Sequence, residues 1–198
     1  MPSLFARAAF PVLAALAVAE LPALASGPAV ESEFPREWFY DDDAQWALHE
    51  PLLGKPIPKL DLGDWLDKKK KVDPKKEFAG KVVVLDFWAT WCGPCKQSIP
   101  HNNEMAEKYG KDGLVFLAIC TSRGQEALEK VAEEHKIEYP CVKDPKEKSA
   151  KAFAVQYYPT YVAIDRAGKV RAVGLKGERV EEVVKKLLAE PAPAAAAK

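Results

Sequence analysis

Residues 80–95 read GKVVVLDFWATWCGPC, an apolar run that leads into two cysteines separated by two residues. Residues 82–85 are four consecutive apolar side chains, which is typical of a strand buried on both faces of a sheet. Pro94 stands at the start of a segment that continues to Tyr109 and closes at Gly110, which predicts a helix over 94–109. Cys92 is therefore expected at the N-terminus of a helix that follows a buried strand.

A cysteine at a helix N-terminus is suited to redox chemistry. Unpaired backbone N–H groups and the helix dipole favour its thiolate, and such sites lower a cysteine pKa from about 8.5 toward 7 or below. Cys95, in the first turn, is placed to attack a mixed disulfide formed on Cys92. The pattern predicts that Cys92 and Cys95 form a redox couple, with a static loop disulfide as the alternative.

The same spacing is also used for half of a metal site. A structural zinc ion needs four ligands, and no second Cys or His pair stands at matching spacing. The three histidines, His49, His101 and His135, are scattered. We therefore expect no metal site and no cofactor beyond the redox-active disulfide itself.

The rest of the pattern predicts an α/β fold. Further strands are expected at 114–120, 139–142, 160–164 and 170–173, with a turn at 165–168 and amphipathic helices near 128–132 and 180–188. Leu60, Leu62 and Trp65 predict a short strand or hairpin, and the run 68–71 of four lysines predicts a solvated loop. Strands alternating with helices, then a hairpin and a helix, imply a mixed β-sheet flanked by helices.

The two ends of the chain differ in composition from this region. Residues 1–25 have a positive Arg7, an apolar run at 8–19 and small residues at Ala23 and Ala25, which predicts a cleaved signal peptide and an exported, periplasmic or extracytoplasmic protein. The alternative is an uncleaved N-terminus that tethers the protein to the membrane. Residues 26–52 are expected to be an extended, acidic and aromatic lead-in, residues 53–190 the domain, and residues 191–198 a disordered Pro/Ala tail.

Charge excludes one class of partner. Lys+Arg and Asp+Glu both number 29, so the formal net charge is zero. A nucleic-acid-binding domain would carry a basic excess. We expect no nucleic-acid partner.

The chain resembles the thioredoxin superfamily, and more narrowly the exported TlpA/ResA-like thiol–disulfide oxidoreductases. The resemblance covers residues 53–190. It rests on the 80–95 stretch, on Ile99-Pro100, on Tyr158-Pro159-Thr160 before a strand and on Gly174 after the next strand. It implies a thioredoxin fold with an N-terminal extension.

The resemblance also implies a set of site residues. Pro159 would follow a cis peptide bond and lie against the two sulfurs, which exposes the Tyr158 backbone for pairing with an extended substrate segment. Trp88 and Trp91 resemble the aromatic residues that flank the thiols. The implied substrate-binding residues are Trp91, Gly93, Pro94, Tyr158 and Thr160.

Asp86 interrupts an otherwise apolar strand six residues before Cys92. A buried carboxylate is costly unless it is paired or protonated, which favours a functional role. The resemblance implies that Asp86 assists deprotonation of Cys95, through water. The family's lysine near this aspartate is missing, because residues 114–120 are apolar apart from Cys120. The alternative is a strand-end residue that reaches solvent.

Cys120 and Cys141 fall in two strands that are expected to be parallel neighbours. An offset of about four residues places them ~13 Å apart, beyond the ~7 Å limit for a disulfide. We expect both to be buried, inert thiols.

The function expected from these features is dithiol–disulfide exchange with protein partners. Gly93 and Pro94 do not stabilise the thiolate further, which favours a reducing couple. The resemblance implies a membrane protein as electron donor and apocytochrome c or a similar thiol protein as target.

Two alternatives share the fold. A peroxiredoxin would have Thr or Ser where Ala89 stands and Pro where Leu85 stands. A copper carrier would use Cys92 and Cys95 as soft ligands for Cu(I), usually with a distant histidine and wider cysteine spacing.

Overall fold

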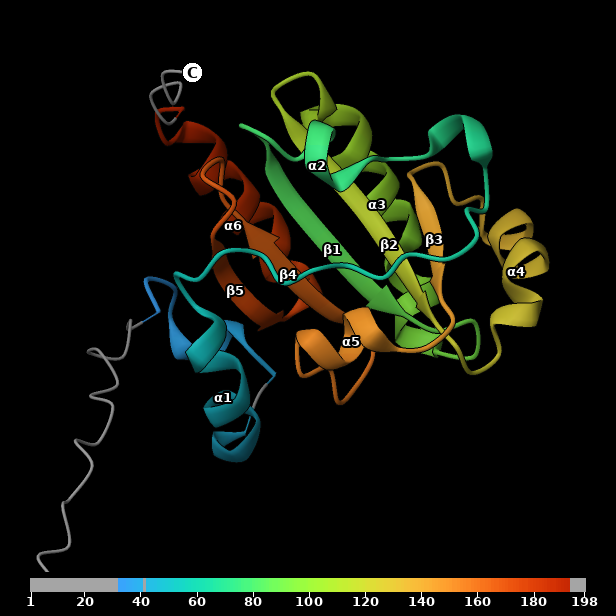
Figure 1. Ribbon diagram of the computed structural model, residues 1–198, viewed down its shortest axis with the longest axis horizontal. Coiled ribbons are helices and arrows are strands. Elements are labelled where there is room, and N and C mark those ends of the chain that lie inside the picture. Colours follow the sequence, from blue (N-terminus) through green and yellow to red (C-terminus); the bar gives the residue numbers. More distant parts are fainter. Residues whose placement is uncertain (1–31, 41, 193–198) are drawn as a thin grey trace, which may run out of the picture.

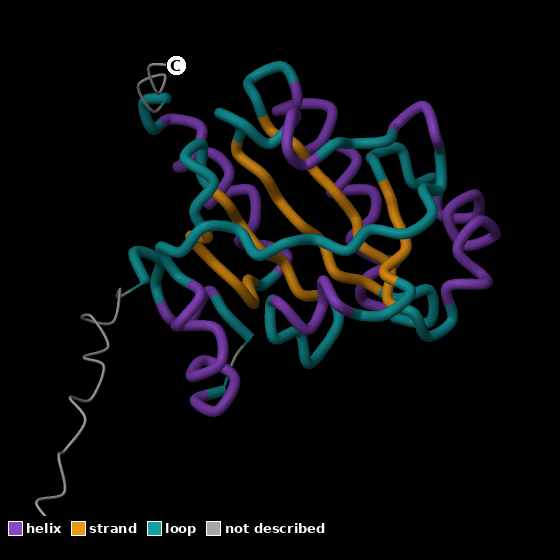
Figure 2. The backbone as a smooth tube through the Cα atoms, in the orientation of Figure 1, coloured by secondary structure: helices purple, strands orange, loops and turns teal. Residues whose placement is uncertain are grey.

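The computed structural model of the protein describes residues 32–40 and 42–192, and its centre is a five-stranded β-sheet (Figures 1 and 2). The strand order is β3-β2-β1-β4-β5, with β1 parallel to β2, β2 parallel to β3, and β4 antiparallel to both β1 and β5. The sheet is therefore mixed, as predicted. The strands are β1 Val82–Trp88, β2 Leu114–Thr121, β3 Cys141–Asp144, β4 Thr160–Ile164 and β5 Val170–Leu175.

Six α-helices accompany the sheet in the described part of the chain. They are α1 Asp43–His49, α2 Pro74–Glu77, α3 Gly93–Gly110, α4 Leu128–His135, α5 Lys148–Ala152 and α6 Gly177–Ala189. The helices expected near 94–109, 128–132 and 180–188 correspond to α3, α4 and α6. Short 3-10 turns lie at Arg36–Trp38, Glu50–Leu52, Lys68–Lys70 and Gln125–Ala127.

One face of the sheet packs against α3, α4 and α6. Alternate residues of β1 and β2 point to this face, because side chains along a strand alternate. They meet apolar side chains such as Met105 of α3, Leu128 of α4 and Val184 of α6. The two active-site cysteines belong to this same cluster.

The other face is covered by an extended crossing segment, residues 53–66, rather than by a long helix (Figure 1). Near one end, Gly54 N–H donates to Val170 O at 2.8 Å, and near the other Gly63 N–H donates to Lys143 O at 2.8 Å. The segment thus runs from β5 to β3 across the whole sheet. The predicted strand or hairpin at Leu60–Trp65 is wrong, since only an isolated bridge joins Trp65 to Val142.

Residues 32–52, called here the N-terminal segment, are more regular than the extended lead-in expected for them. They contain α1, whose N-cap Asp42 accepts a hydrogen bond from Gln45 N–H. Phe34 and Phe39 are buried in the core of the domain. The proposed signal peptide falls within residues 1–31, and most of the Pro/Ala tail within 193–198, both outside the described residues.

The start of the third strand and the offset between Cys120 and Cys141 differ from the expectation. The third strand begins at Cys141, two residues later than predicted, and places Cys141 beside Ala118 and Cys120 beside Lys143. The offset between the cysteines is therefore two residues and not four, which still gives a Cα separation of roughly 8 Å. Both thiols are free and buried. The lysine run forms an exposed 3-10 turn at Lys68–Lys70.

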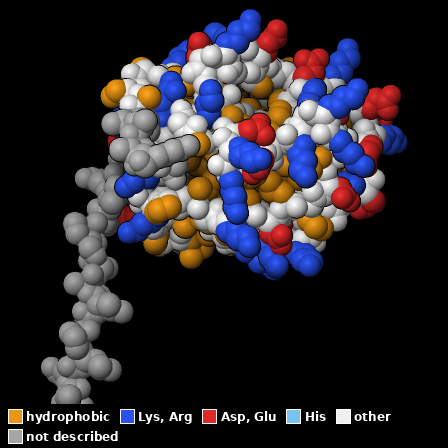
Figure 3. All heavy atoms as spheres, turned by 45° about the horizontal axis from the view of Figure 1, so that its top comes forward, with side chains coloured by type: hydrophobic (Ala, Val, Ile, Leu, Met, Phe, Trp, Pro, Cys, Tyr) orange, Lys and Arg blue, Asp and Glu red, His pale blue; other side chains and the backbone are white. Residues whose placement is uncertain are grey.

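The surface carries charges of both signs. Figure 3 shows Lys and Arg side chains interspersed with Asp and Glu on the face that it displays. Among residues 32–40 and 42–192, no helix combines the length and apolar composition needed to cross a bilayer.

Candidate active site

The two cysteines of the CxxC pair lie where β1 ends and α3 begins. Every residue of β1 is buried, and the short connection Ala89–Trp91 leads to Cys92 at the N-cap of α3. Cys92 has an extended backbone, with φ −78° and ψ 110°, and its Sγ accepts a hydrogen bond from Cys95 N–H at 3.1 Å. The N-terminus of an 18-residue helix therefore points at the sulfur that we expect to attack.

In this structure Cys92 and Cys95 form a disulfide. Their exposed fractions are 4% and 2%, so only a small part of the two residues is accessible to a partner. Gly93 and Pro94, between them, are exposed. Of the four cysteines, these two are the ones that the fold brings into a covalent pair.

Pro159 follows a cis peptide bond, as the resemblance implied. It lines the same cleft as Pro94, a space of about 450 Å³ whose wall includes Tyr157 and Tyr158. The loop before β4 and the start of α3 thus share one cavity beside the disulfide.

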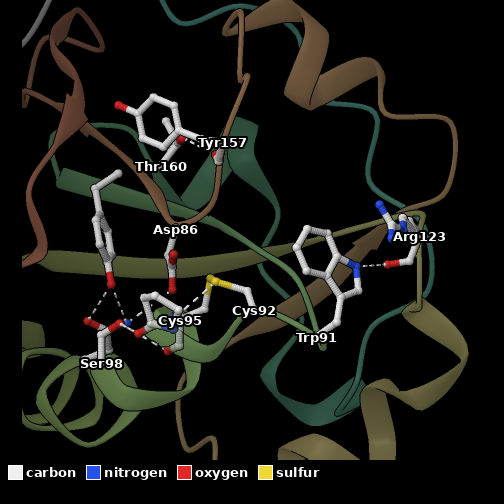
Figure 4. The surroundings of a disulfide bond; sticks show 11 residues. Asp86, Trp91, Cys92, Cys95, Ser98, Arg123, Tyr157 and Thr160 are labelled. Carbon is white, nitrogen blue, oxygen red and sulfur yellow. Dashed lines mark hydrogen bonds between the residues drawn. A yellow bond between two sulfur atoms is a disulfide. The ribbon is translucent and has the colours of Figure 1, made fainter. Parts of the chain in front are cut away.

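Thr160 does not face this cleft in the way expected of a substrate contact. It is fully buried, and its hydroxyl donates to Tyr157 O at 2.5 Å (Figure 4). Its position indicates that it shapes the loop carrying Tyr158 and Pro159.

Trp91 is half exposed and lies on the opposite side of the disulfide from Asp86 (Figure 4). Its indole Nε1 donates to Arg123 O at 3.1 Å, and the Arg123 guanidinium lies 4.9 Å from the ring centre. The Tyr158 ring meets it edge-on at 5.9 Å. These contacts hold an aromatic side chain at the surface next to Cys92. Trp88, in contrast, is buried within β1.

Asp86 is buried and has few partners. Its exposed fraction is 3%, which excludes a strand-end carboxylate in solvent. Asn102 of α3 donates its amide to Asp86 Oδ2 at 3.2 Å and to the Tyr161 hydroxyl at 3.2 Å. Asp86 Oδ1 has no hydrogen-bond partner among the described residues. Burial raises the pKa of Asp86 to about 8, because the charged form loses its hydration.

The residue beside Asp86 on β2 is Ala118, and the residue opposite it on β4 is Tyr161. The carboxyl group therefore has no cationic neighbour across the sheet, in agreement with the missing lysine. Figure 4 shows its side chain directed toward the start of α3, on the Cys95 side of the disulfide. A carboxyl group of this pKa can exchange protons near neutral pH.

Sequence reasoning missed Asn102 and Gly124. Asn102 occupies the buried face of α3 together with Ile99 and Met105, and a polar residue in that apolar series was the available signal. Gly124 accepts a hydrogen bond from the Thr90 hydroxyl at 2.7 Å. It lies in a loop that the pattern of apolar residues did not distinguish from other loops.

The chain is similar to known thiol–disulfide proteins. Residues 52–188 match the family model described as Redoxin. The protein named thiol-disulfide oxidoreductase ResA of Bacillus thuringiensis subsp. konkukian is 31% identical over 141 residues, covering 71% of this chain and 79% of the relative. The ResA protein of Geobacillus thermodenitrificans is 32% identical over 136 residues, covering 69% and 76%.

The chain is also similar to a solved structure whose name describes the same chemistry as these relatives. A Chlorobium tepidum protein, described as a thiol:disulfide interchange protein DsbE, is 31% identical and superposes with a TM-score of 0.59. The superposition covers 69% of this chain and 98% of that protein. All three names describe exchange between thiols and disulfides.

Proposed function

Because this chain belongs to the Redoxin family of thioredoxin-like proteins and is a thiol–disulfide oxidoreductase, we propose that it reduces protein disulfides outside the cytoplasm. The observation that carries the proposal is the position of the Cys92–Cys95 pair, with Cys92 at the N-cap of α3 beside a cleft large enough for a polypeptide segment.

The proposed cycle starts from the dithiol form. The Cys92 thiolate attacks one sulfur of a partner disulfide, which forms a mixed disulfide and releases the other partner sulfur as a thiolate. Cys95, once deprotonated, attacks the Cys92 sulfur and releases the second partner thiolate. Two electrons pass to the partner, and the enzyme ends with the Cys92–Cys95 disulfide. The cycle uses no cofactor other than this disulfide.

Groups around the two cysteines have defined roles in this cycle. The Cys95 N–H and the α3 dipole stabilise the Cys92 thiolate. Asp86 exchanges a proton with Cys95 through water, at a pKa of about 8 that burial produces. Pro159 and Tyr158 border the cleft in which the partner segment lies.

The reductive direction is supported by the residues between the cysteines. Gly93 and Pro94 have no side-chain donor or charge that would stabilise the thiolate further, and a less stabilised thiolate gives a more reducing couple. A reductase in an oxidising compartment needs a supply of electrons. We propose a membrane protein as this donor, and apocytochrome c or a similar thiol protein as the target.

Export is supported by the composition of residues 1–25. The same segment, if it is not cleaved, would tether the protein to the membrane.

The two alternatives receive less support. Leu85 and Ala89 occupy the positions that a peroxiredoxin gives to Pro and Thr or Ser, and both are fully buried. A copper carrier would bind Cu(I) through Cys92 and Cys95 as soft ligands, and metal titration separates that alternative from redox exchange.

The reduction potential of the Cys92/Cys95 couple tests the proposed direction. We expect a value near that of thioredoxin, about −270 mV, when the full chain is equilibrated with thiol–disulfide buffers and its free thiols are alkylated and counted by mass. A value near −120 mV would contradict the reductase role and indicate a disulfide donor. The matched control is the double substitution Cys120→Ser and Cys141→Ser. It removes only free, buried thiols, so the potential is expected to stay the same.

A further inference from the structure

The cleft beside the disulfide has two walls of different origin. One wall comes from the domain and contains Pro94, Pro159, Tyr157 and Tyr158. The other comes from the N-terminal segment and contains Tyr40, Asp42 and Gln45. The Redoxin match begins at residue 52, so this second wall lies outside the part of the chain that defines the family.

The second wall is anchored to the sheet. Tyr40 N–H donates to Gly174 O at 3.1 Å, and Lys176 N–H donates to Trp38 O at 2.8 Å, so residues 38–40 pair with the outer edge of β5. Phe39, between them, is buried and meets the Trp46 ring of α1 edge-on at 5.1 Å. These contacts fix both Tyr40 and α1 beside the active site.

Tyr40 is an aromatic side chain that the fold leaves at the surface. Its exposed fraction is 54%, although its backbone is bound to β5. Its ring faces Tyr157 edge-on at 6.2 Å, with Lys176 Nζ 5.8 Å from the ring centre. Exposed tyrosines held in a fixed position are typical of surfaces that bind other proteins.

Gln45 adds a polar group to the same wall. Asp42 accepts a hydrogen bond from the Gln45 backbone, which fixes this residue in the first turn of α1. The Gln45 side-chain amide has no hydrogen-bond partner among residues 32–40 and 42–192. It therefore retains a donor and an acceptor that an extended peptide backbone can use.

We propose that Tyr40 determines which partner proteins the enzyme reduces, while Gln45 beside it binds the partner's backbone. The cleft takes an extended segment of the partner, with a large apolar side chain close to the reacting cysteine and against Tyr40. The inference rests on the proposed function, because the partner cysteine must reach Cys92. The cleft adjoins the disulfide, because Pro94 lies between the two cysteines and also lines the cleft. A partner segment bound in the cleft can therefore bring its cysteine to Cys92.

The spacing of an extended peptide sets how far this apolar side chain can lie from the reacting cysteine. An extended chain advances about 3.3 Å per residue, so a side chain one to three residues from the cysteine lies within about 10 Å of it. The edge-on tyrosines and the two proline rings supply an apolar surface for that side chain. Trp91 borders the other side of the disulfide and is not part of this cleft.

The test compares two peptide disulfides that differ in one residue. Each peptide carries a single cysteine in a disulfide with a small thiol, and the residue next to the cysteine is Phe in one and Gly in the other. We expect the full chain, in its reduced form, to reduce the Phe peptide with the lower KM. Tyr40→Ala is expected to abolish most of this preference, by raising the KM for the Phe peptide about three- to tenfold with little change in kcat.

Two further variants make the result specific. Tyr40→Phe keeps the ring and is expected to keep the preference. Leu48→Ala removes another half-exposed apolar side chain of α1 that does not line the cleft, and is expected to change neither KM. A Tyr40→Ala protein that still prefers the Phe peptide to the original extent would overturn the inference.

A small disulfide without a peptide serves as a third substrate. It distinguishes failure of the inference about Tyr40 from failure of the proposed function. If the unaltered chain reduces neither peptide nor small disulfide, the proposed function fails and the inference with it. If it reduces all of them and the Tyr40 variants leave the preference unchanged, only the inference fails.

Discussion

Asp86 is buried in the middle of β1, and this burial determines the protonation state of its carboxyl group. Its neighbours across the sheet are Ala118 and Tyr161, neither of which is cationic. The Asn102 amide donates to one carboxyl oxygen, and the other has no hydrogen-bond partner in the part of the chain that the structure describes. A buried carboxyl group in this setting favours its neutral form, which explains why its pKa rises to about 8.

We expect Asp86→Asn to stabilise the oxidised protein at neutral and alkaline pH. The folded pKa of about 8 exceeds the ordinary value of 3.8, so between these values the folded state binds more protons than the unfolded state. Wild-type stability should therefore fall as the pH rises from about 4 to 8, with the loss complete above the folded pKa. The substitution removes this loss, and the free energy of unfolding at pH 7 should rise by about 2–4 kcal/mol.

Urea unfolding at a series of pH values measures this effect. The stability difference between Asp86→Asn and the unaltered chain should be small near pH 4 and grow toward pH 8. Asp112→Asn, at an exposed carboxylate, is the matched control and should show no such trend. An equal difference at every pH would mean that the substitution acts through packing and not through the proton.

Several site residues could be predicted one by one from the sequence, and others could not. Cys92, Cys95 and Asp86 interrupt apolar patterns and carry reactive groups, so their types and positions are informative. Asn102 becomes part of the site only because α3 brings it over β1, 16 residues away in sequence. The resemblance implies a role for Thr160 at the cleft, but Thr160 begins β4, which is buried at every position, and its hydroxyl donates to Tyr157 O.

At the scale of elements, two loops at the ends of neighbouring parallel strands support each other. The loop after β1 carries Thr90 and Trp91, and the loop after β2 carries Arg123 and Gly124. Thr90 Oγ1 donates to Gly124 O and Trp91 Nε1 donates to Arg123 O. The position of the residues just before Cys92 thus depends on a loop more than 30 residues further along the chain.

Gly124→Ala is expected to disturb this contact. Gly124 has φ +80°, and a Cβ added there would lie 2.8 Å from Thr90 Oγ1 and 3.0 Å from Trp91 Cδ1. The left-handed backbone and the close contact together should lower the free energy of unfolding by about 1–3 kcal/mol. Because the loop carries Trp91, disulfide reduction should also slow.

Thermal unfolding and a turnover assay measure the two effects. Gly168→Ala is the matched control: Gly168 also has a positive φ, of +75°, but a Cβ there meets nothing within 4 Å. It should lose stability through backbone strain alone and keep its activity. Equal loss of activity in both variants would contradict a specific role of the Gly124 contact.

The elements that could be predicted are those whose apolar residues follow the spacing of a buried strand or an amphipathic helix within a short stretch of sequence. β1 and β2 are apolar runs apart from Asp86 and the terminal Thr121, and α6 repeats its apolar residues at helical spacing. The crossing segment resembles a strand locally, because Leu60 and Leu62 stand two residues apart and Trp65 follows them. The ends of the segment bind the two edge strands β5 and β3, while its middle crosses the face of the sheet without a strand partner, and local spacing does not distinguish these situations. Helix α5 has five residues, too few to show a period.

At the scale of the whole molecule, Arg171 joins both ends of the described chain. Its guanidinium binds Glu33 of the N-terminal segment, Glu190 after α6 and Asp165 of the β4–β5 turn. Lys186 of α6 also binds Glu33, at 3.1 Å. A single side chain on β5 therefore helps to hold the N-terminal segment in the position that brings Tyr40 to the cleft.

We expect Arg171→Ala to loosen the N-terminal segment before the rest of the domain. The substitution leaves three carboxylates without their shared cation, and the free energy of unfolding should fall by about 1–3 kcal/mol. Limited proteolysis should then cut within residues 32–52 faster than elsewhere. The difference in free energy of unfolding between Arg171→Ala and the unaltered chain should become smaller at high salt, because salt screens these partly exposed ion pairs.

Lys130→Ala provides the control for that experiment. Lys130 pairs with Glu134 on an exposed face of α4, and pairs of this kind contribute little. It should alter neither stability nor the cleavage pattern. Uniform cleavage of the Arg171→Ala protein along the domain would mean that the arginine stabilises the whole fold and not the N-terminal segment in particular.

The burial of Cys120 and Cys141 has a consequence for the number of ways in which the chain can be cross-linked. Four cysteines allow three connectivities with two disulfides each, and an unfolded chain is open to all of them. In the folded protein Cys120 and Cys141 lie about 8 Å apart, beyond the reach of a disulfide, and burial raises the pKa of both thiols, so neither supplies a thiolate to an oxidant. One pairing remains. Folding itself therefore determines which cysteines pair, and an oxidant that acts on the folded protein can form only the Cys92–Cys95 disulfide.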